Sequence, residues 1–325
     1  MNSDTNDELQ FATDALQKIA STIRQVFIGQ ESVVNDLLRC FVASGHVLLE
    51  GVPGLGKTLL VRALAACFSG KTGRIQFTPD LMPSDITGHS IFNMKEGKFE
   101  VRKGPIFTNI LLADEINRAP AKTQAALLEV MQEQRVSIDD ITFQVESPFM
   151  VLATQNPIEQ DGTYPLPEAE LDRFMIKSLI SYPDEATEAR IVELATHGKY
   201  STSLNVDVIE PCVSVDEINR LRQITTSVEV DESVLSYAVR IVRETRVASG
   251  ISRGASPRAS IAAIVMARVA ALQEARTYVI PDDVKAVALP VLRHRIALTT
   301  DLEIEGKSTD TVIEDLLAQV EAPRS

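Results

Sequence analysis

The stretch "LLEGVPGLGKTLL" (residues 48–60) decides the fold. An apolar run ends at Glu50, a glycine-rich loop follows, and a helical run begins at Lys57. The loop Gly51-Val52-Pro53-Gly54-Leu55-Gly56-Lys57-Thr58 matches G-x-x-x-x-G-K-[ST] in full. Backbone N–H groups of such a loop, with the start of the next helix, converge on a phosphate. The motif predicts that these residues bind a nucleoside triphosphate, with Lys57 at the β- and γ-phosphates and Thr58 on Mg²⁺.

Two further strand ends carry polar residues suited to hydrolysis. The apolar run "NILLADE" (residues 109–115) ends in Asp114-Glu115. Asp114 would hold the metal with its water shell, and Glu115 would polarise the attacking water. Asn156, at the end of the apolar run 148–156, would orient that water. An acidic strand end in solvent and a turn-forming Asn before Pro are the alternatives.

Two arginines complete the set of candidates. Arg173, in "PEAELDRFMI", is by default a solvated charge, but in a ring NTPase an Arg at this place faces the neighbour's γ-phosphate. In "GASPRASIAA", Ser256 and Pro257 mark a helix start, so Arg258 lies in the first turn. A cation there opposes the helix dipole. An anion shared by Arg258 and the helix terminus would explain it, and a plain surface arginine is the alternative.

The pattern of the first half predicts an α/β fold. Short apolar strands alternate with helices, which indicates a parallel sheet covered on both sides, with each strand apolar on both faces. The strands are expected at 46–50, 74–78, 109–115, 148–156 and 174–180. Two segments interrupt this rhythm and are predicted to be inserted β-hairpins, 90–104 with a turn at Glu96-Gly97 and 135–145 with a turn at Asp139-Asp140.

The second half has a different pattern. Segments with helical periodicity and acidic or Ser/Pro starts follow one another from about residue 183. We therefore predict two domains, a nucleotide-binding core with N-terminal helices over 1–182 and a smaller all-α lid over 183–325. One helix is expected to run over 281–298, and the acidic tail beyond 300 is expected to be frayed.

Composition narrows the function classes. The chain has 325 residues and a net charge of −13, which makes it a poor general binder of nucleic acid or anionic membrane. Its three cysteines, at 40, 67 and 212, lack C-x-x-C spacing, which argues against a zinc site and fits a reducing compartment. The N-terminus is not a signal peptide, and no apolar stretch is long enough for a membrane span. We expect a cytoplasmic protein.

The same residues carry a resemblance to a known family. The chain resembles the AAA+ ATPases, and within them the MoxR branch, over roughly residues 25–300. The resemblance rests on "GVPGLGKT", "LLADEINRAPAKTQAALLEVMQE", "VLATQNPIEQDGTYPLPEAELDRF" and "GASPRA". It implies an αβα core with a helical lid, and hexameric rings with ATP and Mg²⁺ at the subunit boundaries. The two hairpins resemble the insertions of this clade.

The resemblance also implies a role for each candidate residue. Lys57 and Thr58 would belong to Walker A, and Asp114 and Glu115 to Walker B. Asn156 would be sensor 1, Arg173 the arginine finger and Arg258 sensor 2, acting on its own or on the neighbour's nucleotide. Gly29 and Gln30, in "VFIGQ", would line the adenine pocket. Arg118, in "DEINR", would contact a phosphate or a subunit in trans.

MoxR-like ATPases remodel, mature or activate protein complexes, often with a partner that bears a von Willebrand factor A domain. The resemblance therefore implies a chaperone-like ATPase whose partner is a separate chain. A metal-chelatase motor subunit shares the core and stays an alternative. A DNA-directed motor is a weaker one, because hairpin 90–104 carries only four basic against two acidic side chains. A nucleotide switch without hydrolysis conflicts with the complete set of acid, sensor and arginines.

Overall fold

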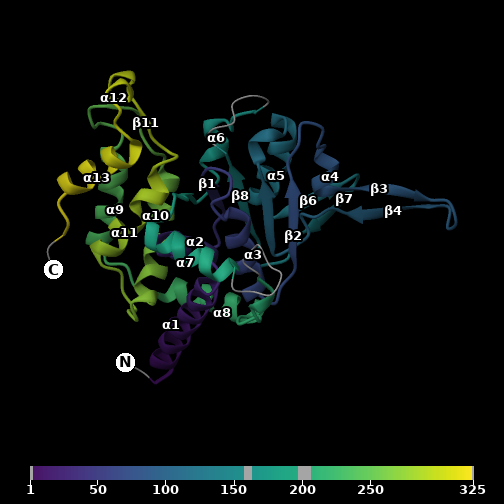
Figure 1. Ribbon diagram of the computed structural model, residues 1–325, viewed down its shortest axis with the longest axis horizontal. Coiled ribbons are helices and arrows are strands. Elements are labelled where there is room, and N and C mark those ends of the chain that lie inside the picture. Colours follow the sequence, from purple (N-terminus) through teal and green to yellow (C-terminus); the bar gives the residue numbers. More distant parts are fainter. Residues whose placement is uncertain (1–2, 157–162, 197–205, 324–325) are drawn as a thin grey trace.

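The computed structural model describes residues 3–156, 163–196 and 206–323, so part of the family-like stretch, 157–162, lies outside the described residues. Its centre is a parallel sheet of five strands (Figure 1). Their order across the sheet is β2 (Thr72–Gln76), β5 (Ile110–Asp114), β8 (Met150–Gln155), β1 (Val47–Glu50) and β9 (Ile176–Leu179). The predicted parallel sheet is confirmed.

Successive residues of the central strands pack on opposite faces of the sheet. Leu48, Leu111 and Val151 belong to one hydrophobic cluster, whereas Leu49 and Leu152 belong to the other. The first cluster includes residues of α4 (Pro83–Thr87) and α5 (Ala121–Glu133), and the second includes α1 (Ser3–Arg24), α2 (Glu31–Val42) and α3 (Lys57–Cys67). Helices on both faces bury both sides of the sheet, which confirms the αβα sandwich.

The edge strand β2 corrects one expectation. The prediction that each strand is apolar on both faces is wrong here, because Thr72, Arg74 and Gln76 are exposed and Ile75 is the buried residue that faces the core. β2 has only β5 as a neighbour in the sheet, so it is less covered than the central strands. Its register places Gln76 opposite Asp114.

Both predicted hairpins are confirmed. β3 (Gly88–Asn93) pairs with β4 (Lys98–Lys103), and β6 (Arg135–Ile138) pairs with β7 (Ile141–Gln144). The β3–β4 hairpin projects far from the body of the molecule (Figure 1). Its tip presents large apolar side chains to solvent, with Met94 90% and Phe99 72% exposed.

The second half is largely helical, as predicted. Its helices are α7 (Glu185–Thr196), the short η2 (Val206–Val208), α8 (Val215–Ser227), α9 (Glu232–Glu244), α10 (Pro257–Gln273) and α11 (Pro281–Leu292). The prediction that it is all-α is wrong, because β10 (Ile251–Arg253) pairs with β11 (Ala297–Leu298). The expected helix over 281–298 ends at Leu292 for the same reason, since the chain turns away to reach β10.

The tail also differs from expectation. It forms α12 (Thr300–Ile304) and α13 (Thr309–Gln319) rather than a frayed end. Ser308 caps α13 by accepting a hydrogen bond from the Thr311 N–H at 3.1 Å. Ile313 and Leu316 of α13 are buried against the lid, so apolar burial holds the tail in place.

The N-terminal helices pack on the lid as well as on the core. α1 and α2 share one hydrophobic cluster with α8 and α10. Polar contacts join them too, since the Thr13 hydroxyl donates to the Leu272 carbonyl at 3.1 Å and Arg39 Nε donates to Gln273 Oε1 at 2.6 Å. The domain boundary at residues 182/183 stays a prediction. Within the described ranges, no helix is both long and apolar enough to cross a membrane.

Candidate functional site

The P-loop joins the end of β1 to the start of α3. Gly54 and Gly56 have φ values of +87° and +81°, which a residue with a Cβ adopts only under strain. A Cβ on Gly51 would lie 2.7 Å from the Ile180 carbonyl oxygen, so this position also requires glycine. Gly56 is the N-cap of α3 and provides no side-chain cap. The loop therefore leaves the N–H groups at the start of α3 for an anion.

Lys57 and Thr58 are the first two residues of α3. The Lys57 ammonium lies back over the loop, where it donates to the Gly51 carbonyl and to the Val52 carbonyl, the latter at 3.2 Å. These carbonyls belong to the cradle itself. The ammonium therefore lies against the loop whose N–H groups are predicted to bind phosphate.

Asp114 is the last residue of β5, and β5 is separated from β1 by β8. Asp114 is 8% exposed, and its Oδ1 accepts from the Thr154 hydroxyl of β8 at 2.6 Å. Its Oδ2 accepts from Arg74 Nη2 of β2 at 2.8 Å. Three adjacent strands thus fix the carboxylate at the carboxyl edge of the sheet, where open α/β sheets bind ligands.

Glu115, the residue after Asp114, has an unusual backbone conformation. Its φ and ψ of +57° and +51° are left-handed, which is uncommon for a residue other than glycine and recurs at functional sites. Its N–H donates to Thr154 Oγ1 at 2.8 Å. Its carboxylate accepts from Gln76 Nε2 at 2.9 Å and pairs with Arg118 Nε at 3.0 Å. Arg118, at the end of η1 (Ile116–Arg118), is therefore bound to Glu115 of its own chain.

Sequence reasoning missed three residues at this edge. Arg74, Gln76 and Thr154 bind the two predicted acids, directly or through the backbone. Polar residues two apart in a strand share one face, so the pair 74 and 76 was a visible signal. Its meaning depends on β2 lying beside β5, which the sequence does not state. Asn156 follows β8 directly and is buried.

A cavity of about 460 Å³ lies beside the P-loop. One wall is Val26 to Ile28 with Gln30, another is loop residues 53–56, and the third is Tyr182 with residues of α7. Gln30 Nε2 donates to the Ser181 carbonyl at 3.0 Å, which ties the first wall to the third. Gly29 is not a lining residue, but its φ of +81° and a Cβ position 2.2 Å from Thr187 Cγ2 require glycine there.

These features fit a nucleotide. The cavity is largely apolar and has the dimensions of a small-molecule site, as a purine base requires. It adjoins the glycine cradle, whose N–H groups suit phosphates. Asp114 and the Thr58 hydroxyl are oxygen donors of the kind that Mg²⁺ takes.

Arg173 lies elsewhere. It follows the short helix α6 (Glu168–Leu171), and its Nη1 donates to the Leu128 carbonyl of α5 at 2.8 Å. It lines an open hollow of about 550 Å³ with residues of α5 and of the β6–β7 hairpin, and this hollow shares no lining residue with the cavity beside the P-loop. The structure therefore does not bring Arg173 to the P-loop of its own chain.

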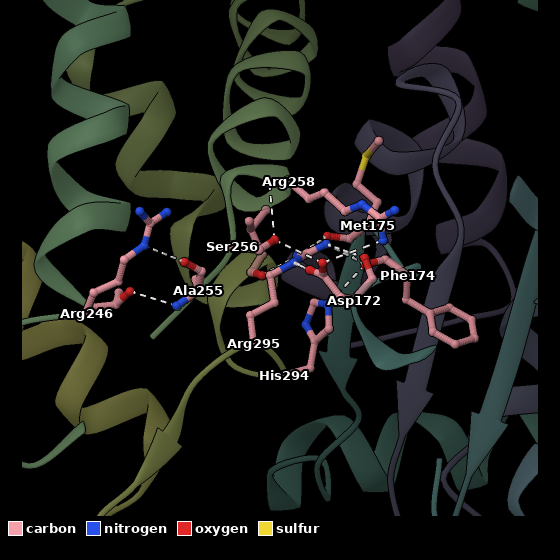
Figure 2. Close-up of polar contacts among 11 residues, drawn as sticks. Asp172, Phe174, Met175, Arg246, Ala255, Ser256, Arg258, His294 and Arg295 are labelled. Atoms are coloured by element: carbon pink, nitrogen blue, oxygen red, sulfur yellow. Dashed lines mark hydrogen bonds and ion pairs between the residues drawn. The ribbon is translucent and has the colours of Figure 1, made fainter. Parts of the chain in front are cut away.

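Arg258 lies in the first turn of α10, as predicted, with Ser256 as the N-cap. Figure 2 shows both beside Asp172, the residue before Arg173. Arg258 Nη1 is 3.7 Å from Asp172 Oδ2, and the Ser256 hydroxyl donates to the same oxygen at 2.9 Å. The structure places the Asp172 carboxylate at the helix start beside Arg258, and the sensor 2 role of Arg258 toward a nucleotide stays a prediction.

Comparisons with known proteins match both halves of the chain. The model of the ATPase family associated with various cellular activities (AAA) matches residues 46–176, and the AAA lid domain model matches residues 243–316. The chain is 44% identical to "Uncharacterized protein YeaC" of Bacillus subtilis, with 95% of both chains covered. It is 43% identical to "Chaperone MoxR1" of Mycobacterium tuberculosis, with 95% of this chain and 82% of that protein covered.

A solved structure of a Cytophaga hutchinsonii protein has the same architecture. It superimposes with a TM-score of 0.89 at 42% identity and covers 98% of each chain. The likeness extends over core and lid together, so the arrangement of both is shared.

Proposed function

This chain belongs to the MoxR family of AAA+ ATPases, and from this premise we propose that it hydrolyses ATP in a ring to remodel a protein complex. One observation carries the proposal. The glycine cradle at the end of β1, the Asp114-Glu115 pair at the end of β5 and Asn156 at the end of β8 lie at one edge of one sheet. Phosphate binding, metal binding and water activation thus have candidate groups within one site.

Each residue has a role in this proposal. Residues 51–58 bind the phosphates, and Lys57 leaves the loop carbonyls to neutralise the β- and γ-phosphates. Asp114 and Thr58 would hold Mg²⁺, which would offset charge on the transferred phosphoryl group. Glu115 accepts a proton from the attacking water, and Asn156 orients that water. Ile28 and Gln30 contact the base, and Arg173 completes the neighbour's site.

One surface feature favours a protein rather than a nucleic acid as the target of the ATPase. The β3–β4 hairpin projects from the body and exposes Phe92, Met94 and Phe99 at its end. Exposed apolar side chains favour a protein surface over a phosphate backbone.

We propose a hexamer in the cytoplasm, acting with a partner that bears a von Willebrand factor A domain. All three cysteines are unpaired, as suits a reducing compartment.

The test of the site is a pair of variants. Lys57→Ala should abolish ATP binding, because it removes a charge-assisted contact to the phosphates. Glu115→Gln should still bind ATP and lose turnover, because the cradle and Asp114 remain. Lys285→Ala and Glu314→Gln, at exposed lid positions, are the matched controls and should behave as wild type. ATP affinity of Lys57→Ala equal to wild type would contradict the P-loop assignment.

The test of assembly is light scattering with and without a non-hydrolysable ATP analogue. The analogue should favour the ring, because a ligand that contacts two subunits binds the assembled state better and so stabilises it. A monomer at micromolar concentration under both conditions would count against the ring.

A further inference from the structure

The segment that carries Arg173 is held by the lid. Residues 172–175 connect α6 to β9, and three consecutive lid residues after α11 bind backbone carbonyls of this connection and of Lys177 in β9. Figure 2 shows two of them, His294 and Arg295, beside Asp172, Phe174 and Met175. Arg293 Nη1 donates to the Lys177 carbonyl at 3.3 Å, and His294 Nε2 lies 3.0 Å from the Phe174 carbonyl oxygen. Arg295 makes the largest share of these contacts. We call Arg293, His294 and Arg295 the lid clamp.

Arg295 grips the chain on both sides of Arg173. Its Nε donates to Asp172 Oδ1 at 2.7 Å, and its Nη2 donates to the Phe174 carbonyl at 2.7 Å. Its Nη1 donates to the Met175 carbonyl at 2.9 Å and also to the Val291 carbonyl of α11. The side chain is 3% exposed, so little water competes for these bonds. The planar fork of an arginine fixes direction as well as distance.

A second lid element bears on the same carboxylate. Ser256 and Arg258 at the start of α10 contact Asp172 Oδ2, opposite the oxygen that Arg295 binds. The turn before α10 is itself fixed within the lid, since Arg246 Nε donates to the Ala255 carbonyl at 2.8 Å and the Ala255 N–H donates to Thr245 Oγ1 at 2.9 Å. The turn that contacts Asp172 is therefore anchored to the end of α9.

The Arg173 side chain itself points away from this junction, to the Leu128 carbonyl of α5. Its backbone thus lies between two clamped neighbours while its guanidinium borders the open hollow. A shift of the lid would move the backbone of Asp172 and Phe174. The Arg173 Cα lies between them, so the Arg173 side chain would move as well.

We propose that Arg295 is a positioning residue for Arg173, so that the lid of one subunit sets the placement of the arginine offered to the next subunit's nucleotide. This inference rests on the proposed function, in which Arg173 acts in trans. The lid of one subunit would thus affect ATP hydrolysis in the neighbouring subunit rather than in its own. Arg295 touches no nucleotide in this role and acts only through residues 172–175.

The experiment uses composite sites in mixed rings. The reference mixture combines Lys57→Ala subunits, which offer an intact Arg173, with Arg173→Ala subunits, which offer an intact P-loop. Sites between the two kinds should recover turnover. The test mixture replaces the first partner by the double variant Lys57→Ala/Arg295→Lys. Because its own P-loop is already inactive, any further loss reports on the neighbour's site.

We expect the test mixture to recover about 10- to 100-fold less turnover than the reference, because a misplacement of about 1 Å can cost about 10² in rate. The matched control is Lys57→Ala/Arg276→Lys. Arg276 makes a bidentate pair with Asp283 inside the lid, at 2.8 and 2.6 Å, and has no bond to residues 172–177, so this mixture should equal the reference. Labelled subunits and scattering must show equal exchange and equal assembly in all three mixtures.

Recovery equal to the reference would overturn the role of Arg295 while leaving the proposed function in place. If subunits exchange and the reference mixture still recovers no turnover, Arg173 does not act in trans. That result would overturn both the composite site and this inference. If the Arg295→Lys double variant fails to assemble, Lys57→Ala/Asp172→Asn takes its place, since the amide keeps the shape and removes the charge that Arg295 binds. A smaller loss in the same direction supports the proposal, and full recovery overturns it.

Discussion

The two clusters of charged side chains in this molecule differ in how much water they meet. At the P-loop edge, Arg74 and Arg118 reach Asp114 and Glu115 with side chains that are 57% and 40% exposed. Under the lid, the Arg295 side chain is 3% exposed, and its guanidinium donates to Asp172, Phe174, Met175 and Val291. The arginines of the first cluster stay in contact with water, although Asp114 itself is nearly buried, whereas the guanidinium of the second is enclosed by its acceptors.

The difference separates two kinds of consequence. Exposed ion pairs contribute about 0–1 kcal/mol to folding, so the P-loop edge can exchange its partners when a ligand arrives. A buried charge that loses its partner is strongly destabilising, so the junction under the lid keeps one arrangement. Substitutions at the P-loop edge should therefore change chemistry and spare folding, whereas substitutions at the junction should change both.

The largest effect is expected at Arg173, whose backbone lies at the junction under the lid and whose side chain borders the open hollow. Arg173→Ala should bind ATP almost normally and lose about 10³–10⁵ in turnover, the range for arginine fingers. This corresponds to about 4–7 kcal/mol of transition-state stabilisation. Folding should be spared, because Arg173 gives up one bond to the Leu128 carbonyl. The measurements are steady-state turnover, ATP binding and thermal unfolding.

The matched control for Arg173 is Arg240→Ala. Arg240 is a lid arginine that also donates to a backbone carbonyl, that of Glu321 at 3.0 Å. It should keep full turnover. Loss of less than about tenfold in Arg173→Ala would place Arg173 among ordinary surface residues, whose substitution changes stability by about 0.5 kcal/mol or less.

A second prediction concerns His46, a buried histidine just before β1 whose backbone carbonyl binds the segment 172–175 that the lid holds. Its Nδ1 accepts from the Val151 N–H at 3.0 Å, so the proton is on Nε2, which donates to the Met131 carbonyl at 3.1 Å. Its carbonyl accepts from the Met175 N–H at 2.9 Å. Burial is the main cause that lowers the pKa of His46 from 6.5 to about 4.

The sign follows from the two pKa values. Between pH 6.5 and about 4 the unfolded chain binds a proton at His46 that the folded chain does not, so stability falls as pH falls through this window. The loss amounts to about 3 kcal/mol at most. His46→Gln lacks this contribution, so its stability deficit relative to wild type at pH 7 should shrink as the pH approaches 4.

Denaturant unfolding at several pH values measures this difference. Comparison with the variant removes the other titrating groups, among them Asp36, whose pKa burial raises to about 6 with the opposite effect on stability. A constant gap between the two proteins from pH 7 to 4 would contradict the prediction.

How far the sequence reaches depends on how near in the chain the interacting residues lie. The P-loop was predictable because its residues are consecutive and each has a chemical reason to be there. Asp114, Glu115 and Asn156 were predictable because parallel strands place their ends at one edge. The MoxR-type fold followed from these motifs, the two hairpins followed from alternating patterns around a turn, and both predictions are confirmed.

What was missed depends on pairings between distant segments. Arg295 and Asp172 are 123 positions apart, and nothing in "RHR" states what it binds. Arg74 required the strand order, and the β10–β11 pair required the end of α11 to leave the helix. The tail looked frayed because it is acidic, although Ile313 and Leu316 at helical spacing were enough to anchor it.

The smallest effect is expected at Arg74, where the comparison between the two clusters is tested most directly. Arg74 Nη2 binds Asp114 Oδ2, an oxygen of the carboxylate that is proposed to hold Mg²⁺. Arginine and metal should compete for it, since both require its lone pairs and its charge. Arg74→Gln should therefore lower the Mg²⁺ concentration needed for half-maximal turnover, by about fivefold at most, because a pair whose arginine is exposed to water contributes about 1 kcal/mol or less. The free energy of unfolding should change by no more than about 1 kcal/mol.

A Mg²⁺ titration of turnover measures the shift, and Arg24→Gln, which removes an exposed arginine 4.0 Å from Glu31, is the control. If Arg74→Gln needs more Mg²⁺ than wild type, Arg74 holds Asp114 ready for the metal instead of competing with it, and the P-loop edge is more rigid than its exposure indicates.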